Sequence, residues 1–142
     1  MVGHEFVGEV ESIIGPTLVE LGYTLTDVDA NVDEGGRSGA AVFYSGYDSR
    51  VQVYWSAREG EINCMVGPLD APNTHGLYDK SKKWRYLREF APKPDLPLEE
   101  LVKVLREERQ FFVSTTKWLY WLRGQIESHL SAARVGVLGL DD

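Results

Sequence analysis

A row of carboxylate and amide side chains is the part of this chain that comes closest to known binding chemistry. Oxygen-bearing residues occupy every second position of one short segment: Asp27, Asp29, Asn31 and Asp33. The spacing Asp-x-Asp-x-Asn matches the first half of a calcium-binding EF-hand loop. The second half is missing, because Val32 stands where the turn glycine is needed and Ser38 where the bidentate glutamate is needed. The segment therefore predicts no calcium site.

The same segment has the two-residue period of a β-strand. Val28, Ala30 and Val32 would lie on the buried face of this strand, and the acidic residues would lie on its solvent face. We call these acidic residues, together with the glutamate that follows them, the acid stripe: Asp27, Asp29, Asp33 and Glu34. Exposed carboxylates at this density favour a basic protein or peptide as the binding partner.

A second candidate site lies in segment 67–80, which contains Gly67-Pro68 and His75-Gly76 and is longer than an ordinary connection. Polar residues of this segment and cations that follow it could bind a phosphorylated or acidic small molecule: Asp70, His75, Tyr78, Lys82, Lys83 and Arg85. A pocket formed by these groups would make the chain a small-molecule-binding protein or an enzyme.

Residues 80–88 carry five cations and no acid. Cations interleaved with Trp84 and Tyr86 could hold nucleic acid by charge and by stacking. In the alternative interpretation, Trp84 and Leu87 face the core and the cations form the solvated face of a helix. The net charge of −7 repels phosphate backbones, so nucleic acid is not the expected partner.

No arrangement of residues in the sequence specifies a reaction. His4, His75 and His129 do not have the spacing of zinc ligands. The single cysteine, Cys64, lies in an alternating apolar run that is typical of a buried thiol. Glycine-rich phosphate loops and nucleophile elbows do not occur in the sequence. We therefore expect no metal, no cofactor and no catalytic residue.

Aromatic residues are concentrated between positions 111 and 121. Trp118 and Trp121 are three residues apart and share one face of a helix, whereas Tyr120 points elsewhere. These rings either close a large hydrophobic core or leave apolar surface for a homodimer interface or a ligand groove. Trp118 and Trp121 are therefore included among the candidate partner-binding residues.

The composition is that of an ordinary globular protein. A length of 142 residues, 43% of them hydrophobic and 26% charged, predicts a single domain over residues 1–142. The amino terminus has no basic segment followed by an apolar core, and no stretch approaches the roughly 20 apolar residues that span a bilayer. We expect a cytoplasmic protein that does not enter a membrane.

Hydrophobic spacing predicts the elements that would position these sites. A helix from Phe6 to Leu21 should be interrupted at Gly15-Pro16. Strands are expected at 40–44, 50–56 and 61–66 after the acidic one, joined by short turns into a four-stranded antiparallel meander. A short helix should run from Ser81 to about Phe90, and residues 98–130 should form one long helix or two with a break near Ser114. The tail 135–142 is either frayed or docked.

This order of elements predicts an α+β fold with helices packed on one face of an antiparallel sheet. In this layout and in its acidic charge the chain resembles two kinds of small bacterial protein, the immunity proteins that neutralise toxins and the acidic secretion chaperones that dimerise. The resemblance implies a non-enzymatic protein-binding module and a possible homodimer. It rests on layout alone, so it assigns no residue a role.

Overall fold

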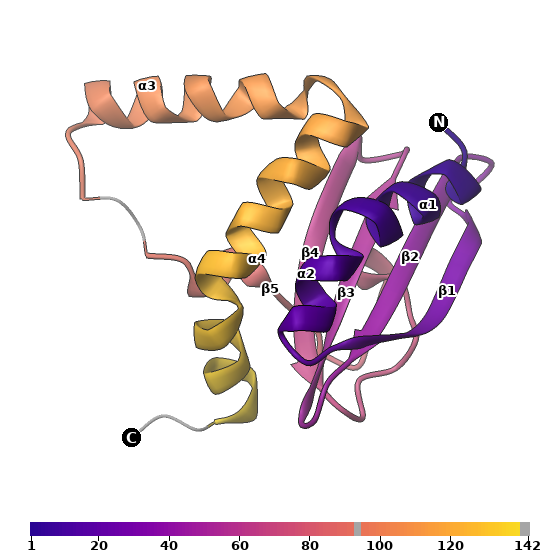
Figure 1. Cartoon of the computed structure of the whole chain (residues 1–142). Helices are drawn as coiled ribbons and strands as arrows, with labels where there is room; N and C mark the ends of the chain where they lie inside the picture. The colour runs from indigo at the N-terminus through magenta and orange to yellow at the C-terminus, as the bar shows by residue number, and fades with distance from the viewer. Residues whose placement is uncertain (93–94, 140–142) are drawn as a thin grey trace.

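An antiparallel sheet with helices on one face organises the chain. The computed structural model describes residues 1–92 and 95–139. The sheet has five strands in the order β1-β2-β3-β4-β5, with bounds Thr24–Asp33, Ser38–Ser45, Ser49–Ser56, Glu61–Pro68 and Arg85–Tyr86. The helices are α1 (Gly3–Ile13), α2 (Gly15–Glu20), α3 (Leu98–Glu108) and α4 (Thr115–Leu138), with 3-10 turns η1 (Gly76–Tyr78), η2 (Leu87–Phe90) and η3 (Arg109–Val113). The predicted α+β class and meander order are confirmed, with one strand more than expected (Figure 1).

The break in the first helix falls where the sequence predicts it. The helix α1 ends at Ile13, and Pro16 occupies the first turn of α2, where its missing N–H group costs no hydrogen bond. Phe6, Val10 and Leu18 are fully buried on the side that faces the sheet. Both short helices therefore contribute to one continuous core.

That core lies between the sheet and the helices α1, α2 and α4. Val42, Val53 and Cys64 project from neighbouring strands into it, and α4 supplies buried apolar residues at helical spacing: Leu119, Leu122, Ile126, Leu130 and Ala133. Cys64 is buried, as its sequence context predicts. The central strand β3 is buried along its whole length, which means that its second face is covered too.

The loop between β4 and β5 covers the second face. Trp84 and Ala71 pack there on Phe43, Tyr54 and neighbouring residues of the sheet. The loop passes so close to the sheet that a Cβ atom at position 76, which is glycine, would lie 2.2 Å from the sulfur of Met65. This face of the sheet is therefore a second small core.

The predicted helix from Ser81 to Phe90 is wrong. Lys82 has a left-handed backbone (φ 64°), which interrupts any helix there. Trp84 is drawn into the second core, where its indole Nε1 donates a hydrogen bond of 2.8 Å to the carbonyl oxygen of Pro72. Arg85 and Tyr86 then form the fifth strand against β4, and only a 3-10 turn follows.

Of the two arrangements expected for residues 98–130, the structure has the one with a break near Ser114. The Ser114 side chain accepts a hydrogen bond of 3.2 Å from the backbone N–H of Lys117 and so begins α4. This helix continues to Leu138 and ends at Gly139, which has a left-handed backbone. Residues 135–138 of the predicted tail are thus helical, and 140–142 lie outside the described residues.

The strand β1 is less regular than its alternating sequence predicts. Its pairing with β2 shifts register between Leu25 and Asp27 and again between Asp29 and Val32. Such shifts are β-bulges, which break the strict alternation of faces. Val28 stays on the core side, because it pairs with the fully buried Val42. On this edge strand it is nevertheless 37% exposed, so its predicted burial is wrong.

Candidate protein-docking surface

The acid stripe is divided among several local roles. The carboxylate of Asp29 accepts a hydrogen bond of 3.1 Å from the backbone N–H of Asn31, inside one of the bulges. The carboxylate of Asp33 accepts one of 2.8 Å from the N–H of Gly36 in the following turn. Both side chains remain largely exposed, so they keep acceptor oxygens that face solvent.

Asp27 lies near a buried cation. Arg50 is buried on the loop side of the sheet, where it donates hydrogen bonds to the carbonyl oxygen of Ala71 (2.7 Å) and to the hydroxyl of Ser45 (2.9 Å). Burial lowers the pKa of this guanidinium, and the charge of Asp27 opposes that shift. Asp27 therefore offsets part of the cost of burying the Arg50 charge.

The predicted exposure of Glu34 is wrong. Its side chain is only 4% exposed, because the turn after β1 folds it over Gly39, which has no Cβ atom to block it. One carboxylate oxygen accepts hydrogen bonds from the hydroxyls of Ser56 (2.8 Å) and Tyr78. Glu34 thus ties the β4–β5 loop to the sheet, and the acid stripe is reduced to the exposed Asp29 and Asp33 and the half-buried Asp27.

The residues of the second candidate site do not converge. His75 is buried between the rings of Tyr54 and Tyr78, with ring centroids 4.6 and 5.4 Å away, and its Nε2 atom lies 3.0 Å from the carbonyl oxygen of Trp55. The hydrogen bond to Glu34 raises the pKa of Tyr78. His75 and Glu34 are buried, and the 39% exposed Tyr78 contacts both of them, so this cluster fastens the loop.

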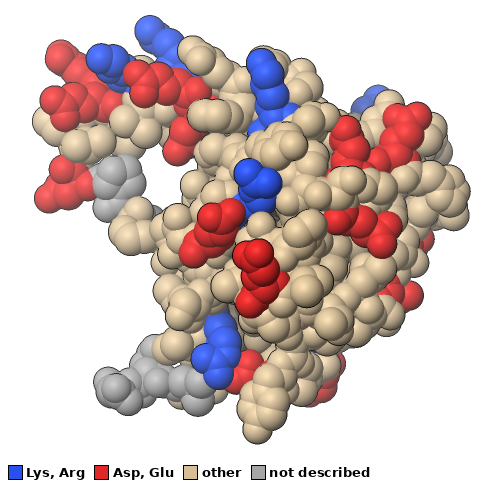
Figure 2. Space-filling model, viewed as in Figure 1, with Lys and Arg blue, Asp and Glu red and all other residues tan. Residues whose placement is uncertain are grey.

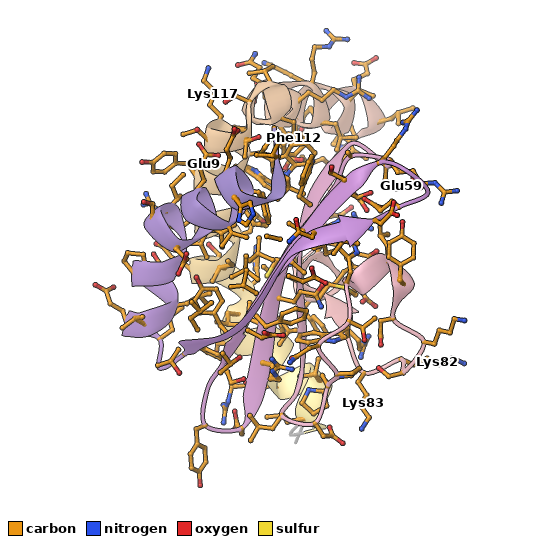
Figure 3. All side chains as sticks on the ribbon, turned by 90° about the vertical axis from the view of Figure 1, so that its right-hand side faces the viewer. Glu9, Glu59, Lys82, Lys83, Phe112 and Lys117 are labelled. Atoms are coloured by element: carbon orange, nitrogen blue, oxygen red, sulfur yellow. The ribbon has the colours of Figure 1, made fainter. Side chains whose placement is uncertain are left out.

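The cations of that candidate site lie on the outside of the loop. Lys83 pairs with Asp70 and lowers the pKa of that carboxyl, and Lys82 and Lys83 both point away from the sheet (Figure 3). Arg85 pairs with Glu89 at 3.3 Å. The structure therefore separates these cations from His75 and Tyr78.

The helix α3 forms an arm that stands away from the rest of the chain (Figure 1). None of its 11 residues is buried, although apolar residues repeat along it at helical spacing. The most exposed of these are Leu98 (76%), Val102 (44%) and Leu105 (49%), which share one side of the helix. We call these three residues the arm stripe. An amphipathic helix with an open apolar side is typical of a surface that binds another protein.

An aromatic groove lies at the root of the arm, where η3 meets α4. The ring of Phe112 packs at 4.6 Å on Trp118 and edge-on at 5.0 Å on Trp121, and it points toward the body of the molecule (Figure 3). These rings line a cavity of about 150 Å³ together with Ile62 of β4 and Leu87 of η2. Both tryptophans also pack on the main core, so they close the core and line a groove at once.

Two exposed apolar residues, Phe111 and Val113, lie in the sequence between the arm stripe and the aromatic groove. Sequence analysis singled out Trp118 and Trp121 but missed the arm, because Leu98, Val102 and Leu105 have the spacing of ordinary core residues. The available signal was the isolation of this helix between Pro97 and Ser114.

Within residues 1–92 and 95–139, no three His, Cys, Asp or Glu side chains are grouped so that they could hold a metal ion. None of the helices in those ranges combines enough length and apolarity to cross a lipid bilayer. Comparisons of the chain with protein-family models, curated proteins and solved structures gave no match.

Proposed function

We propose that this chain is a non-enzymatic, cytoplasmic protein-binding module that docks a protein on the arm stripe and the aromatic groove. The observation that carries the proposal is the helix α3, which has an apolar side and no buried residue. Covering a Leu or Val side chain stabilises a complex by roughly 1.5–3 kcal/mol. The arm stripe alone therefore offers several kcal/mol to a partner that covers it.

The reduced acid stripe supplies a second contact in this proposal. Asp27, Asp29 and Asp33 lie along β1, at an edge of the sheet. Carboxylates at that edge would attract a partner with basic residues, and they would act mainly on the rate and selectivity of association. An immunity-like or chaperone-like role fits a module of this kind.

The test is affinity capture by the tagged protein from extracts of the cells that produce it. Val102→Asp places a charge in the arm stripe, and Val19→Asp makes the same change at an exposed valine of α2 as a matched control. We expect a partner that is retained by the wild type and by Val19→Asp and is lost with Val102→Asp. The proposal would be contradicted if Val102→Asp captured the same proteins as the wild type, where further copies of this chain count as captured proteins.

A charge-reversal variant tests the acid stripe separately. Asp27→Lys combined with Asp29→Lys should weaken capture, and the loss should shrink as salt is raised, because salt screens exposed charges. Capture that is insensitive to this double change would remove the stripe from the interface and leave the arm as the docking surface.

A further inference from the structure

We infer that the protein docked on the arm is a second copy of this chain, with the two α3 helices packed antiparallel about a twofold axis. This inference rests on the proposed function, because it names the partner of the same surface. Its first support is the pattern of apolar residues. With the axis between Leu101 and Val102, Leu98 faces the partner's Leu105 and Leu101 faces the partner's Val102. The stripe is thus complementary to its own reversed copy.

The charges beside the stripe are complementary to their reversed copy as well. Glu99 and Arg106 are seven residues apart and flank the same side of the stripe. In the antiparallel pair Glu99 comes within reach of the partner's Arg106, and the symmetry creates this contact twice. The dipoles of the two helices also oppose each other in this arrangement.

The charges on α3 do not favour the approach of two copies unless they are paired. The chain as a whole carries −7, and α3 carries four glutamates against Lys103 and Arg106, with acids and cations interspersed, as Figure 2 shows for its outer end. Two arms therefore meet favourably only in a register that places Glu99 near the partner's Arg106.

A pair of arms alone would bury a small area. An α-helix of 11 residues is about 16 Å long, and a stable interface needs roughly 800 Å² from each partner. The apolar surface continues beyond the helix through Leu96 at one end and Phe111 and Val113 at the other. The interface therefore extends from the arms toward the aromatic grooves, and the grooves should be less accessible to solvent in the dimer.

The first experiment is light scattering coupled to size exclusion at about 100 µM, where a dimer of micromolar Kd is largely assembled. We expect a mass twice the 16.0 kDa of the chain. Val102→Asp should weaken the dimer about 100-fold, because the pair loses two buried side chains that each contribute roughly tenfold. Val19→Asp should leave the mass unchanged. Since no residue of α3 is buried, the arm variant should keep the circular dichroism of a folded protein.

Charge exchange tests the antiparallel arrangement itself. Glu99→Lys or Arg106→Glu alone should weaken the dimer, because each places like charges opposite each other twice. The double variant should recover most of the affinity. Two turns of helix separate these residues within one copy, so they do not contact each other there and the recovery requires contact between copies. A double variant as weak as the two single changes combined would overturn the antiparallel register.

A cross-link provides the second readout. Val102 lies beside the proposed axis, so Val102→Cys should form a disulfide between copies on mild oxidation, whereas Tyr47→Cys, at an exposed turn outside the arm, should not. The natural Cys64 is buried and does not compete. A monomeric mass at 100 µM with no Val102→Cys cross-link overturns the inference. If Val102→Asp still abolishes capture of a different protein, the proposed function survives that result. If Val102→Asp changes no capture, the proposed function and the dimer inference both fail.

Discussion

Two tyrosines of the sheet should respond in opposite ways to the same substitution. Tyr44 and Tyr54 are both buried in neighbouring strands. The Tyr44 hydroxyl makes no hydrogen bond to any described residue. The Tyr54 hydroxyl donates to a carboxylate oxygen of Glu61 at 2.9 Å and lies 3.3 Å from the hydroxyl of Tyr86. Tyr→Phe therefore removes an unpaired polar group at one position and a bonded one at the other.

The free energy of unfolding should rise for Tyr44→Phe and fall for Tyr54→Phe. A buried polar group without a partner costs about 1–3 kcal/mol, and the small void left by one oxygen offsets part of the gain. We expect Tyr44→Phe to be more stable by about 1 kcal/mol, with a Tm higher by about 3 °C. We expect Tyr54→Phe to be less stable by about 1–2 kcal/mol, because the partners of its hydroxyl also lose a contact.

The assay is urea unfolding followed by tryptophan fluorescence, with Tyr54→Phe as the matched control. If the free energy of unfolding falls with urea at the same slope for the wild type and both variants, the differences between their midpoints measure differences in stability. A Tyr44→Phe protein that loses as much stability as Tyr54→Phe would refute the reasoning, since its hydroxyl would then be hydrogen-bonded in the folded protein.

The same tyrosine predicts how stability depends on alkaline pH. Burial raises the pKa of Tyr44 from 10.0 to about 12. Because the folded pKa lies above the unfolded one, this contribution to stability is complete below pH 10 and is lost as the pH rises to about 12. The loss approaches 3 kcal/mol, at about 1.4 kcal/mol for each unit. Tyr44→Phe should make the fall of stability with pH less steep over this range, although stability still falls because burial also raises the pKa of Tyr23, Tyr54 and Cys64. An unchanged slope would contradict the stated pKa.

Three further predictions concern the helices and the core. Gly124→Ala should stabilise α4 by up to about 1 kcal/mol, because nothing lies near the added methyl group. Gly136→Ala should destabilise the protein, because its Cβ would lie 2.2 Å from the ring of Phe90. Thermal unfolding should show a higher Tm for the first variant and a lower Tm for the second. The hydrogen bond to Arg134 lowers the pKa of Asp48, so this ion pair stabilises the folded protein above the unfolded pKa near 3.8, and its contribution fades as the pH falls below that value. Asp48→Asn should therefore lower the free energy of unfolding by at most about 1 kcal/mol at pH 7 and by almost nothing at pH 2, as urea titration at the two pH values would measure. Burial raises the pKa of the Cys64 thiol, so a disulfide reagent should label it in urea and leave the native protein unlabelled; rapid native labelling would contradict its burial.

Local signals predicted most of the elements. Pro16 divides the first helix because proline lacks an amide hydrogen, and Ser114 begins the last helix because its hydroxyl binds a free N–H group. The segment 81–90 failed because its apolar residues have helical spacing, yet the contact of Trp84 with Pro72 and the pairing of Arg85 with β4 hold it in another conformation. Those contacts involve residues distant in the sequence, which no local pattern reports.

The residues of the candidate sites were likewise predicted in part, because only some of their properties are local. Trp118 and Trp121 were recognised by their spacing and do share a groove. The acid stripe was recognised as well, but the turn after β1 buries Glu34, and the cations expected around His75 point outward instead. A residue's type and position in a strand or helix are local facts, whereas its exposure depends on what else packs there.

The amino-acid sequence by itself determined most of the helices and strands, the burial of Cys64 and the acidic charge, because each depends on residue types and on spacing within a few turns of chain. Only the tertiary structure decided that the loop covers the second face of the sheet and that α3 keeps its apolar side exposed. Leu98, Val102 and Leu105 have the same spacing as the buried residues of α4. Periodicity shows that a helix has an apolar face, but the packing of distant segments determines whether that face is covered.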